Sequence, residues 1–343
     1  MTDSALDLEN GRVELGHGGG GRAMARLVDE LFRAHLDNPF LAEGNDFGAF
    51  DVPGGRMVMS TDGHVIQPLF FPGGDIGSLA VHGTINDVSM AGARPLYLAL
   101  GLVLEEGLPL RDLAAVVESV GRAARAAGVP VVTGDTKVVE RGKADGLYIT
   151  TTGVGLVPPG VEVGGANARP GDAVVLSGPI GEHGVAVLSR REGLGFESDV
   201  VSDSAPLHGL VSRMVEAVPE LRCLRDPTRG GVAAALNEIA QQSGVGMLLR
   251  ESAIPVRAPV RGACELLGLD PLHVANEGRL VAVCPPGRVD ALLATMQTHP
   301  LGRDAVRIGE MVHDDHGFVE LETAYGGRHL VDWLSGEALP RIC

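Results

Sequence analysis

The sequence predicts an α+β protein, rich in strand–helix alternation, that folds as two domains. A chain of 343 residues is longer than one ordinary hydrophobic core supports. Short apolar runs typical of strands alternate with longer segments typical of helices. Two breaks, Val157-Pro158-Pro159-Gly160 and Arg169-Pro170-Gly171, interrupt this series near its middle. We therefore expect a glycine-rich segment and helix at 1–40, an N-terminal domain at 41–165, a C-terminal α/β domain at 166–334 and a mobile tail at 335–343.

The first half alternates short apolar runs, which predict strands, with longer helical patterns. One helical segment carries Val81, Ile85 and Val88 on one face and small residues on the other, so we expect it to be buried on both sides. In chain order we predict strand Arg56–Thr61, helix Ile76–Gly92, strand Leu96–Leu104, helix Leu110–Gly128 and strands Pro130–Val139 and Tyr148–Val157.

The second half repeats this rhythm without a residue-level repeat. The sequence Asp226-Pro227-Thr228 combines a capping residue with a proline, a pattern typical of a helix start. We predict strands Ala173–Ser177, Val245–Leu249, Arg279–Cys284 and Val306–Glu310, and helices Gly184–Arg191, Leu207–Val218, Thr228–Ser243, Val260–Leu267 and Val289–Thr298.

Composition excludes several classes of function. The formal net charge is −16 and only 3% of residues are aromatic, so we expect no nucleic-acid partner. The longest apolar run, Leu96–Leu104, is too short to span a bilayer, and the first ten residues lack the basic start of a signal peptide. The four cysteines form no C-x-x-C pair, which favours the cytoplasm, and we expect Cys264 and Cys284 to be buried small hydrophobic residues.

A glycine run and a set of aspartates are the first candidates for a site. Gly18, Gly19, Gly20 and Gly21 precede the helical segment Arg22–His35, so their backbone could approach an anion closely; a flexible hinge is the alternative. Asp62 and Asp135 follow predicted strands, and Asp87 faces inward on its helix. Asp46 and Asp226 are two more carboxylates, each ahead of an apolar helix or strand. Such oxygen ligands suit Mg²⁺, although each aspartate alone is equally typical of a cap or turn.

Three more residues could carry chemistry. Lys137 follows Asp135 by two positions, so both side chains share one face of a strand; it could neutralise a phosphoryl group or simply pair with Asp135. Glu277, in Asn276-Glu277-Gly278, is either a base or an exposed turn residue. Cys343 ends a tail that could swing between two sites, unless a cysteine at this position is accidental.

Several motifs together resemble one known family. They are Ser60-Thr61-Asp62-Gly63-His64-Val65, Phe70-Phe71-Pro72-Gly73-Gly74-Asp75-Ile76-Gly77, Gly83-Thr84-Ile85-Asn86-Asp87, Thr133-Gly134-Asp135-Thr136-Lys137-Val138-Val139, Asp226-Pro227-Thr228-Arg229-Gly230-Gly231 and Pro340-Arg341-Ile342-Cys343. Over nearly its whole length the chain resembles the HypE family of hydrogenase maturation factors, the carbamoyl dehydratases. That family belongs to the aminoimidazole ribonucleotide synthetase-like superfamily.

The resemblance implies an architecture and a set of ligands. It implies a homodimer whose N-terminal domains form a β-barrel-like interface, with ATP and Mg²⁺ as cofactors. Relatives often have Asp-Ala-Ala where this chain has Asp46-Phe47-Gly48. The metal ligands it implies are Asp46, Asp62, Asp87 and Asp135, and the nucleotide contacts are Gly18, Gly19, Gly20, Gly21, Asn86, Thr136, Asp226 and Arg229.

The resemblance also implies a reaction. A HypF-like carbamoyltransferase would load a carbamoyl group onto the Cys343 sulfur, ATP would phosphorylate the amide oxygen, and loss of phosphate would leave a thiocyanate. The cyano group would then pass to iron on a HypC–HypD-like scaffold complex, as the cyanide ligand of a NiFe-hydrogenase. Lys137 and Glu277 match positions associated with deprotonation of the amide.

Two classes of alternative remain open. Selenophosphate synthetase and aminoimidazole ribonucleotide synthetase share the superfamily, but the first usually carries a reactive Cys or selenocysteine at its glycine loop, where this chain has His17. The second does not need a terminal cysteine. A nucleotide-gated assembly scaffold would bind ATP while Cys343 stays chemically silent.

Overall fold

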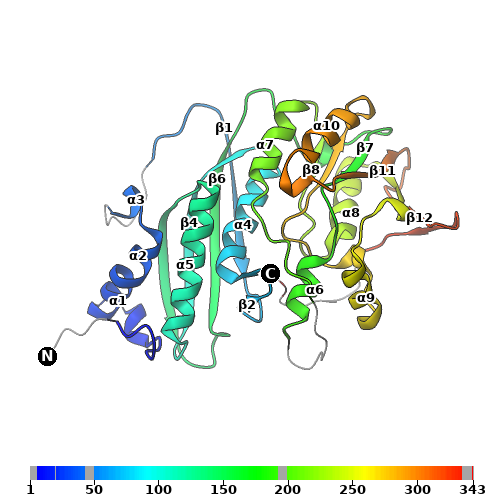
Figure 1. Cartoon of the computed structure of the whole chain (residues 1–343). Coiled ribbons are helices and arrows are strands. Elements are labelled where there is room, and N and C mark those ends of the chain that lie inside the picture. The colour runs from blue at the N-terminus through cyan, green and yellow to red at the C-terminus, as the bar shows by residue number, and fades with distance from the viewer. Residues whose placement is uncertain (1–5, 20, 43–49, 192–198, 334–341, 343) are drawn as a thin grey trace.

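The computed structural model describes residues 6–19, 21–42, 50–191, 199–333 and 342, and contains two main sheets (Figure 1). The first has the strand order β1-β6-β4-β5. Strand β6 is antiparallel to both of its neighbours, while β4 and β5 are parallel. The bounds are β1 Arg56–His64, β4 Arg94–Glu105, β5 Val131–Val139 and β6 Leu147–Val157; a short pair, β2 Phe70–Phe71 and β3 Gly74–Asp75, precedes the first long helix.

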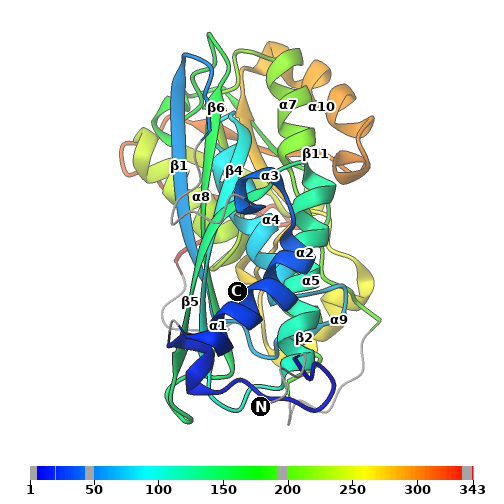
Figure 2. The same cartoon turned by 90° about the vertical axis from the view of Figure 1, so that its left-hand side faces the viewer.

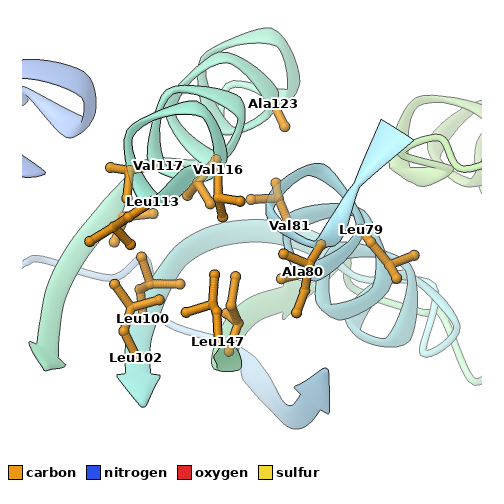
Figure 3. Packing of buried hydrophobic residues seen from close by; sticks show 14 of the residues in the cluster. Leu79, Ala80, Val81, Leu100, Leu102, Leu113, Val116, Val117, Ala123 and Leu147 are labelled. Carbon is orange, nitrogen blue, oxygen red and sulfur yellow. The ribbon is translucent and has the colours of Figure 1, made fainter. Parts of the chain in front are cut away.

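Helices α4 (Ile76–Ser89) and α5 (Leu110–Ala127) cover one face of this sheet (Figure 3). Asp75 starts α4 by accepting hydrogen bonds from the backbone N–H groups of Gly77 and Ser78 at 2.7 and 3.1 Å. The prediction that this helix is buried on both sides is confirmed, since Ala80, Gly83 and Thr84 on the small-residue face are buried as well as Val81 and Val88. Val81 belongs to the first core and Val88 to the core of the second half. Helix α4 therefore joins the two halves.

The opposite face of the first sheet is only partly covered by the described residues. Met57 and Met59 of β1 are 44% and 74% exposed on it. The N-terminal helical segment lies beside β5 at one edge (Figure 2), and it lines a groove of about 780 Å³ together with β4, β5 and β6. That segment comprises α1 (Arg22–Leu27), a π-helical stretch (Val28–Phe32), α2 (Arg33–Leu36) and α3 (Pro39–Ala42).

The second half has three layers. Its sheet has the order β13-β12-β9-β11-β7-β10-β8, antiparallel except for β9 and β12. Val174 and Leu176 of β7 pack toward α8, whereas Ala173 and Val175 pack toward α7 and α10, because side chains alternate along a strand. The elements are β7 Ala173–Leu176, α6 Glu182–Leu188, α7 His208–Ala217, β8 Cys223–Arg225, α8 Gly231–Ser243, β9 Gly246–Arg250, α9 Ala258–Leu267, β10 Val281–Cys284, α10 Val289–Gln297, β11 Val306–Val312, β12 Val319–Glu322 and β13 Arg328–Leu330.

The α+β class is confirmed, with three local corrections. Asp62 and Asp135 do not follow strands but lie inside β1 and β5, because strand pairing continues past them to His64 and Val139. Helix α8 starts at Gly231 and not at Thr228. Short strands β8, β12 and β13 were not predicted, since three or four residues give too little pattern.

Three further expectations concern a barrel, membrane-spanning helices and the cysteines. Within the described residues the first sheet is open and does not close into a barrel. Among the same residues, no helix is both long enough and apolar enough to cross a membrane. Cys264 and Cys284 are buried, as predicted, and so is Cys223.

Candidate active site

Four carboxyl groups from separate parts of the chain gather between the two halves; we call Asp62, Asp87, Asp226 and Glu277 the acidic cluster. Asp62 comes from β1 and Asp87 from α4, which packs on it. Asp226 follows β8, and Glu277 precedes β10. Because Ser60 Oγ donates to Asp87 Oδ2 at 2.7 Å, Asp87 points toward β1.

Burial and mutual repulsion perturb this cluster strongly. Burial, reinforced by Asp87, raises the pKa of Asp226 to about 7. Burial and the charge of Asp226 raise the pKa of Glu277 well above its usual range, and its side chain is only 3% exposed. Burial also raises the pKa of Asp87, although the Ser60 hydrogen bond opposes this shift. Perturbed carboxyl groups in one place are typical of a functional site.

Two oxygens of the cluster are buried without a hydrogen-bond partner, Asp226 Oδ2 and Glu277 Oε1. A buried carboxylate needs a proton or a cation. In the described part of the chain, no three acidic, histidine or cysteine side chains converge closely enough to form a ready-made metal site. The cluster therefore suits a cation that takes one or two carboxylates and completes its shell with phosphate oxygens and water, as Mg²⁺ does.

Basic groups border the cluster on one side. His64 Nε2 lies 3.3 Å from Asp62 Oδ2, but burial lowers the pKa of this imidazole and Arg229 lowers it further. Arg229 itself is exposed. Because its guanidinium is close enough to affect His64 yet open to solvent, it is available to an anion bound over the cluster.

The loop that carries Glu277 is fixed by Asp203. The two carboxylate oxygens of Asp203 accept hydrogen bonds from the Glu277 and Gly278 N–H groups at 3.2 and 3.1 Å. Arg279 Nε lies 3.6 Å from Asp203 Oδ2 and forms an ion pair with it. Asn276 is fully buried and bonds to Gly181, Pro227 and Val274. Glu277 is thus held rigidly in the interior, contrary to the alternative of an exposed turn.

Asn86, expected among the nucleotide contacts, has a different set of partners in the structure. Its amide group donates to the carbonyls of Ala205 and Glu277, both at 3.1 Å, and accepts from Leu207 N–H at 2.7 Å. The side chain is 1% exposed, and all of these hydrogen bonds are to backbone groups. It therefore fastens α4 to the loops of the second half.

Asp135 and Lys137 lie away from the acidic cluster, on the opposite face of the first sheet. Thr151, the partner of Asp62 in β6, bonds to Thr84 of α4, so Asp62 lies on the helix-covered face. Asp135 lies in register with Gly101 and lines the groove with Thr150 and Thr152 on the other face. Thr136, the next residue of β5, also borders the groove but its side chain is buried. Lys137 Nζ lies 3.0 Å from Asp135 Oδ2, which confirms that the two residues share one face.

The glycine segment lies beside this second group. A Cβ on Gly18 would come within 2.7 Å of Val138 N, so glycine is needed for the close approach to β5. Gly19 and Gly21 have room for a side chain by the same criterion. Among the predicted site residues, Gly20, Asp46 and Cys343 lie outside the described residues.

One residue of the tail is described. Ile342 is 2% exposed, and its carbonyl accepts a hydrogen bond from His183 Nε2 at 2.8 Å. Ile342 is therefore docked against the protein in this structure. The mobile tail stays a prediction, because the other tail residues, 335–341 and 343, lie outside the described part.

Sequence reasoning missed His64, His183, Asp203 and Asn276 as members of the site. His64 and Asn276 stand beside predicted residues, in Asp62-Gly63-His64 and Asn276-Glu277-Gly278, and that adjacency was a usable signal. Asp203 lies in a segment without helical or strand periodicity, and nothing in its neighbours pointed to Glu277.

Comparison with known proteins is consistent with this arrangement. The family models described as AIR synthase related protein, N-terminal domain and C-terminal domain, match residues 44–157 and 169–322. Carbamoyl dehydratase HypE of Azotobacter vinelandii is 67% identical over 99% of this chain and 100% of its own length. A crystal structure of hydrogenase maturation protein HypE in complex with ATP has a TM-score of 0.92 at 51% identity, covering 96% of this chain and 99% of its own. A HypE–HypF complex matches with a TM-score of 0.79 at 45% identity, over 90% of this chain and 99% of that one.

The fold and the matched domains define a protein of the AIR synthase-related class. Within that class the identity to carbamoyl dehydratases extends over almost the whole chain. The chain belongs to the HypE family.

Proposed function

We propose that the chain is an ATP-dependent carbamoyl dehydratase that acts on a carbamoyl group carried by its own Cys343. The amide oxygen would take the γ-phosphoryl group of ATP and leave as phosphate, while the nitrogen loses both protons. A thiocarbamate and ATP thus give a thiocyanate, ADP and phosphate. The product would supply the cyanide ligand of a NiFe-hydrogenase iron centre.

The observation that carries this proposal is the link between Glu277 and the tail. The Ser202 hydroxyl bonds to His183 Nδ1 at 2.8 Å, and His183 Nε2 bonds to the Ile342 carbonyl. The next residue, Asp203, holds the Glu277 loop. Two consecutive residues therefore connect the segment before Cys343 to a buried carboxyl group with a strongly raised pKa, which when ionised is a stronger base than an ordinary glutamate.

ATP and Mg²⁺ are the cofactors of this proposal. Asp62, Asp87 and Asp226 would hold the cation, which when bound neutralises and orients the phosphates; Asp46 is a further proposed ligand. Arg229 would contact the nucleotide, together with Thr136 and the Gly18–Gly21 segment. Support comes from the unpartnered Asp226 Oδ2, the mutual repulsion within the cluster and the related HypE structure that contains ATP.

We further propose a homodimer in which the second copy contributes Asp135 and Lys137 to the acidic cluster. One chain carries these residues on the face of the first sheet opposite Asp62 and Asp87, so it cannot bring them together by itself. The same face exposes Met57 and Met59, which favours packing against another apolar surface. Lys137 and Glu277 both stay candidates for the proton acceptor.

The proposed partners follow the order of the reaction. A HypF-like carbamoyltransferase would load Cys343, consistent with the related HypE–HypF complex. A HypC–HypD-like scaffold would receive the cyano group on its iron.

Intact-mass analysis tests the proposal. After incubation with carbamoyl phosphate, the transferase and ATP for its loading step, we expect a gain of about 43 Da on Cys343, which falls to about 25 Da once the dehydratase itself turns over ATP. Cys343→Ala should show neither change. A chain that binds ATP but never gains mass on Cys343 would be a scaffold or a different synthetase.

A further inference from the structure

The buried position of Ile342 rests on contacts with residues from both halves of the chain. Its side chain belongs to the same buried cluster as Val187 of α6 and Ala275, which precedes the Glu277 loop. Its carbonyl oxygen meets His183, the second residue of α6. Phe71 of β2 packs edge-on against the imidazole, with the ring centroids 5.4 Å apart. Ile342 is thus bound by its side chain and by its backbone.

The hydrogen bonds around His183 have only one consistent direction. The Ile342 carbonyl can only accept, so His183 Nε2–H donates to it. In the neutral imidazole Nδ1 then accepts, so the Ser202 hydroxyl donates to Nδ1. Ser202 Oγ in turn accepts from the Ser204 N–H at 3.1 Å. His183 is fully buried, and burial lowers its pKa, which agrees with a neutral ring.

This chain of bonds leads to the acidic cluster. Ser202 is followed by Asp203, whose carboxylate holds Glu277 and Gly278. Glu182, the neighbour of His183, pairs with Arg279 at 2.6 Å, just after that loop. The group that binds Ile342 and the group that fixes Glu277 are therefore parts of one rigid unit.

We propose that His183, Ser202 and Phe71 form a docking site that recognises the Ile342 carbonyl and side chain and thereby positions Cys343 for the reaction. This inference rests on the proposed function, since it assigns the positioning residue that the proposed carrier needs. His183 acts through Ile342 and does not contact the reacting group. When the tail leaves, Nε2–H loses its acceptor and Ile342 loses its apolar surroundings, so docking is favoured but reversible.

Alkylation of the Cys343 thiol by a neutral maleimide, without nucleotide or transferase, tests the docking site. The other cysteines, Cys223, Cys264 and Cys284, are buried, and burial raises the pKa of each to about 11, so they react slowly. We expect His183→Leu to speed the reaction of Cys343 roughly five- to tenfold. His183→Gln keeps a donor at similar reach and should restore part of the protection.

The matched control is His82→Gln. His82 is a partly buried histidine bonded to a serine of the same segment, Ser204, at 3.0 Å, but none of its described hydrogen bonds goes to Ile342. This control should alkylate at the wild-type rate. Equal acceleration in both variants would show general loosening and would overturn the proposal, as would an unchanged rate in folded His183→Leu.

A second variant decides the matter if His183→Leu does not fold. Ile342→Ala leaves His183, Ser202 and Phe71 unchanged and should raise the alkylation rate tenfold or more, because it removes most of the buried side chain of the tail. A wild-type rate in this variant would overturn the proposal. Because alkylation needs no carbamoyl group, a docking site that is found while the mass shift on Cys343 is absent would refute the proposed reaction alone.

Discussion

The two faces of the first sheet carry the same kind of side chain in opposite electrostatic states. On the helix-covered face, burial and, to a smaller extent, the charge of Asp62 raise the pKa of Asp87 of α4. On the open face, the hydrogen bond from Lys137 lowers the pKa of Asp135, which is well exposed. The ionised form of Asp87 is disfavoured, and a bound cation would stabilise it. Asp135 already has Lys137 as its counter-ion. The contrast suggests that each face is one half of a site.

The largest effect should come from the buried face. Glu277→Gln removes the only ionisable group at that position while keeping its shape, so we expect dehydration to slow by about 10²–10⁴-fold, the usual range for a general base. Carbamoylated Cys343 should then accumulate in the presence of ATP, seen as a persistent mass gain. Glu265→Gln, an exposed glutamate on α9, is the matched control. Normal turnover in Glu277→Gln would assign proton removal to Lys137.

The next experiment addresses the two half-sites directly. Asp87→Asn and Lys137→Ala homodimers should each be inactive. If the halves come from different chains, mixing and re-equilibrating the two variants should recover about a quarter of the wild-type activity, because half of the dimers are mixed and each of these has one intact site. Lys143→Ala, an exposed lysine in the turn after β5, serves as the active control. Failure to recover activity in verified mixed dimers would place both residues in one chain's site.

How much of this could be read from the sequence depends on the range of the interactions. Helix α4 and the burial of Asp87 follow from local periodicity, and were predicted. The division of Asp62 and Asp135 between two faces depends on strand order β1-β6-β4-β5, which pairs segments about ninety positions apart. Local patterns do not contain that information, so the aspartates were treated as one set.

The start of α8 shows a different limit. Asp226-Pro227-Thr228 has the composition of a helix start, yet Gly230 and Gly231 both adopt left-handed φ values, 77° and 63°, where α8 begins. A Cβ on Gly231 would lie 2.4 Å from the Leu272 carbonyl oxygen, so close packing against a distant loop fixes this turn. The displaced start leaves Asp226 free to join the acidic cluster and not to cap a helix.

A smaller effect concerns stability and pH. With its pKa raised to about 7, Asp226 keeps its proton in the folded state between about pH 4 and 7, whereas the unfolded chain has lost it. The contribution of Asp226 to the free energy of unfolding therefore falls as pH rises through this window, and it is lowest above pH 7. Asp226→Asn should raise Tm at pH 8 by a few degrees and change it little at pH 4. Asp315→Asn, at an exposed position, should show no such trend, and a pH-independent difference for Asp226→Asn would argue against the shifted pKa.

The smallest effect is expected on the open face, and its size sharpens the contrast. The Lys137–Asp135 pair is about two-thirds exposed, so solvent screens it and its loss should cost at most about 1 kcal/mol of unfolding free energy. Urea unfolding of Lys137→Met should therefore give a midpoint close to wild type, although the proposed activity is lost. If Lys137→Met were strongly destabilised, the pair would be a structural contact within one chain. A stable but inactive variant would instead mean that Lys137 is retained for a partner surface, which is the role that the open face of the sheet would give it.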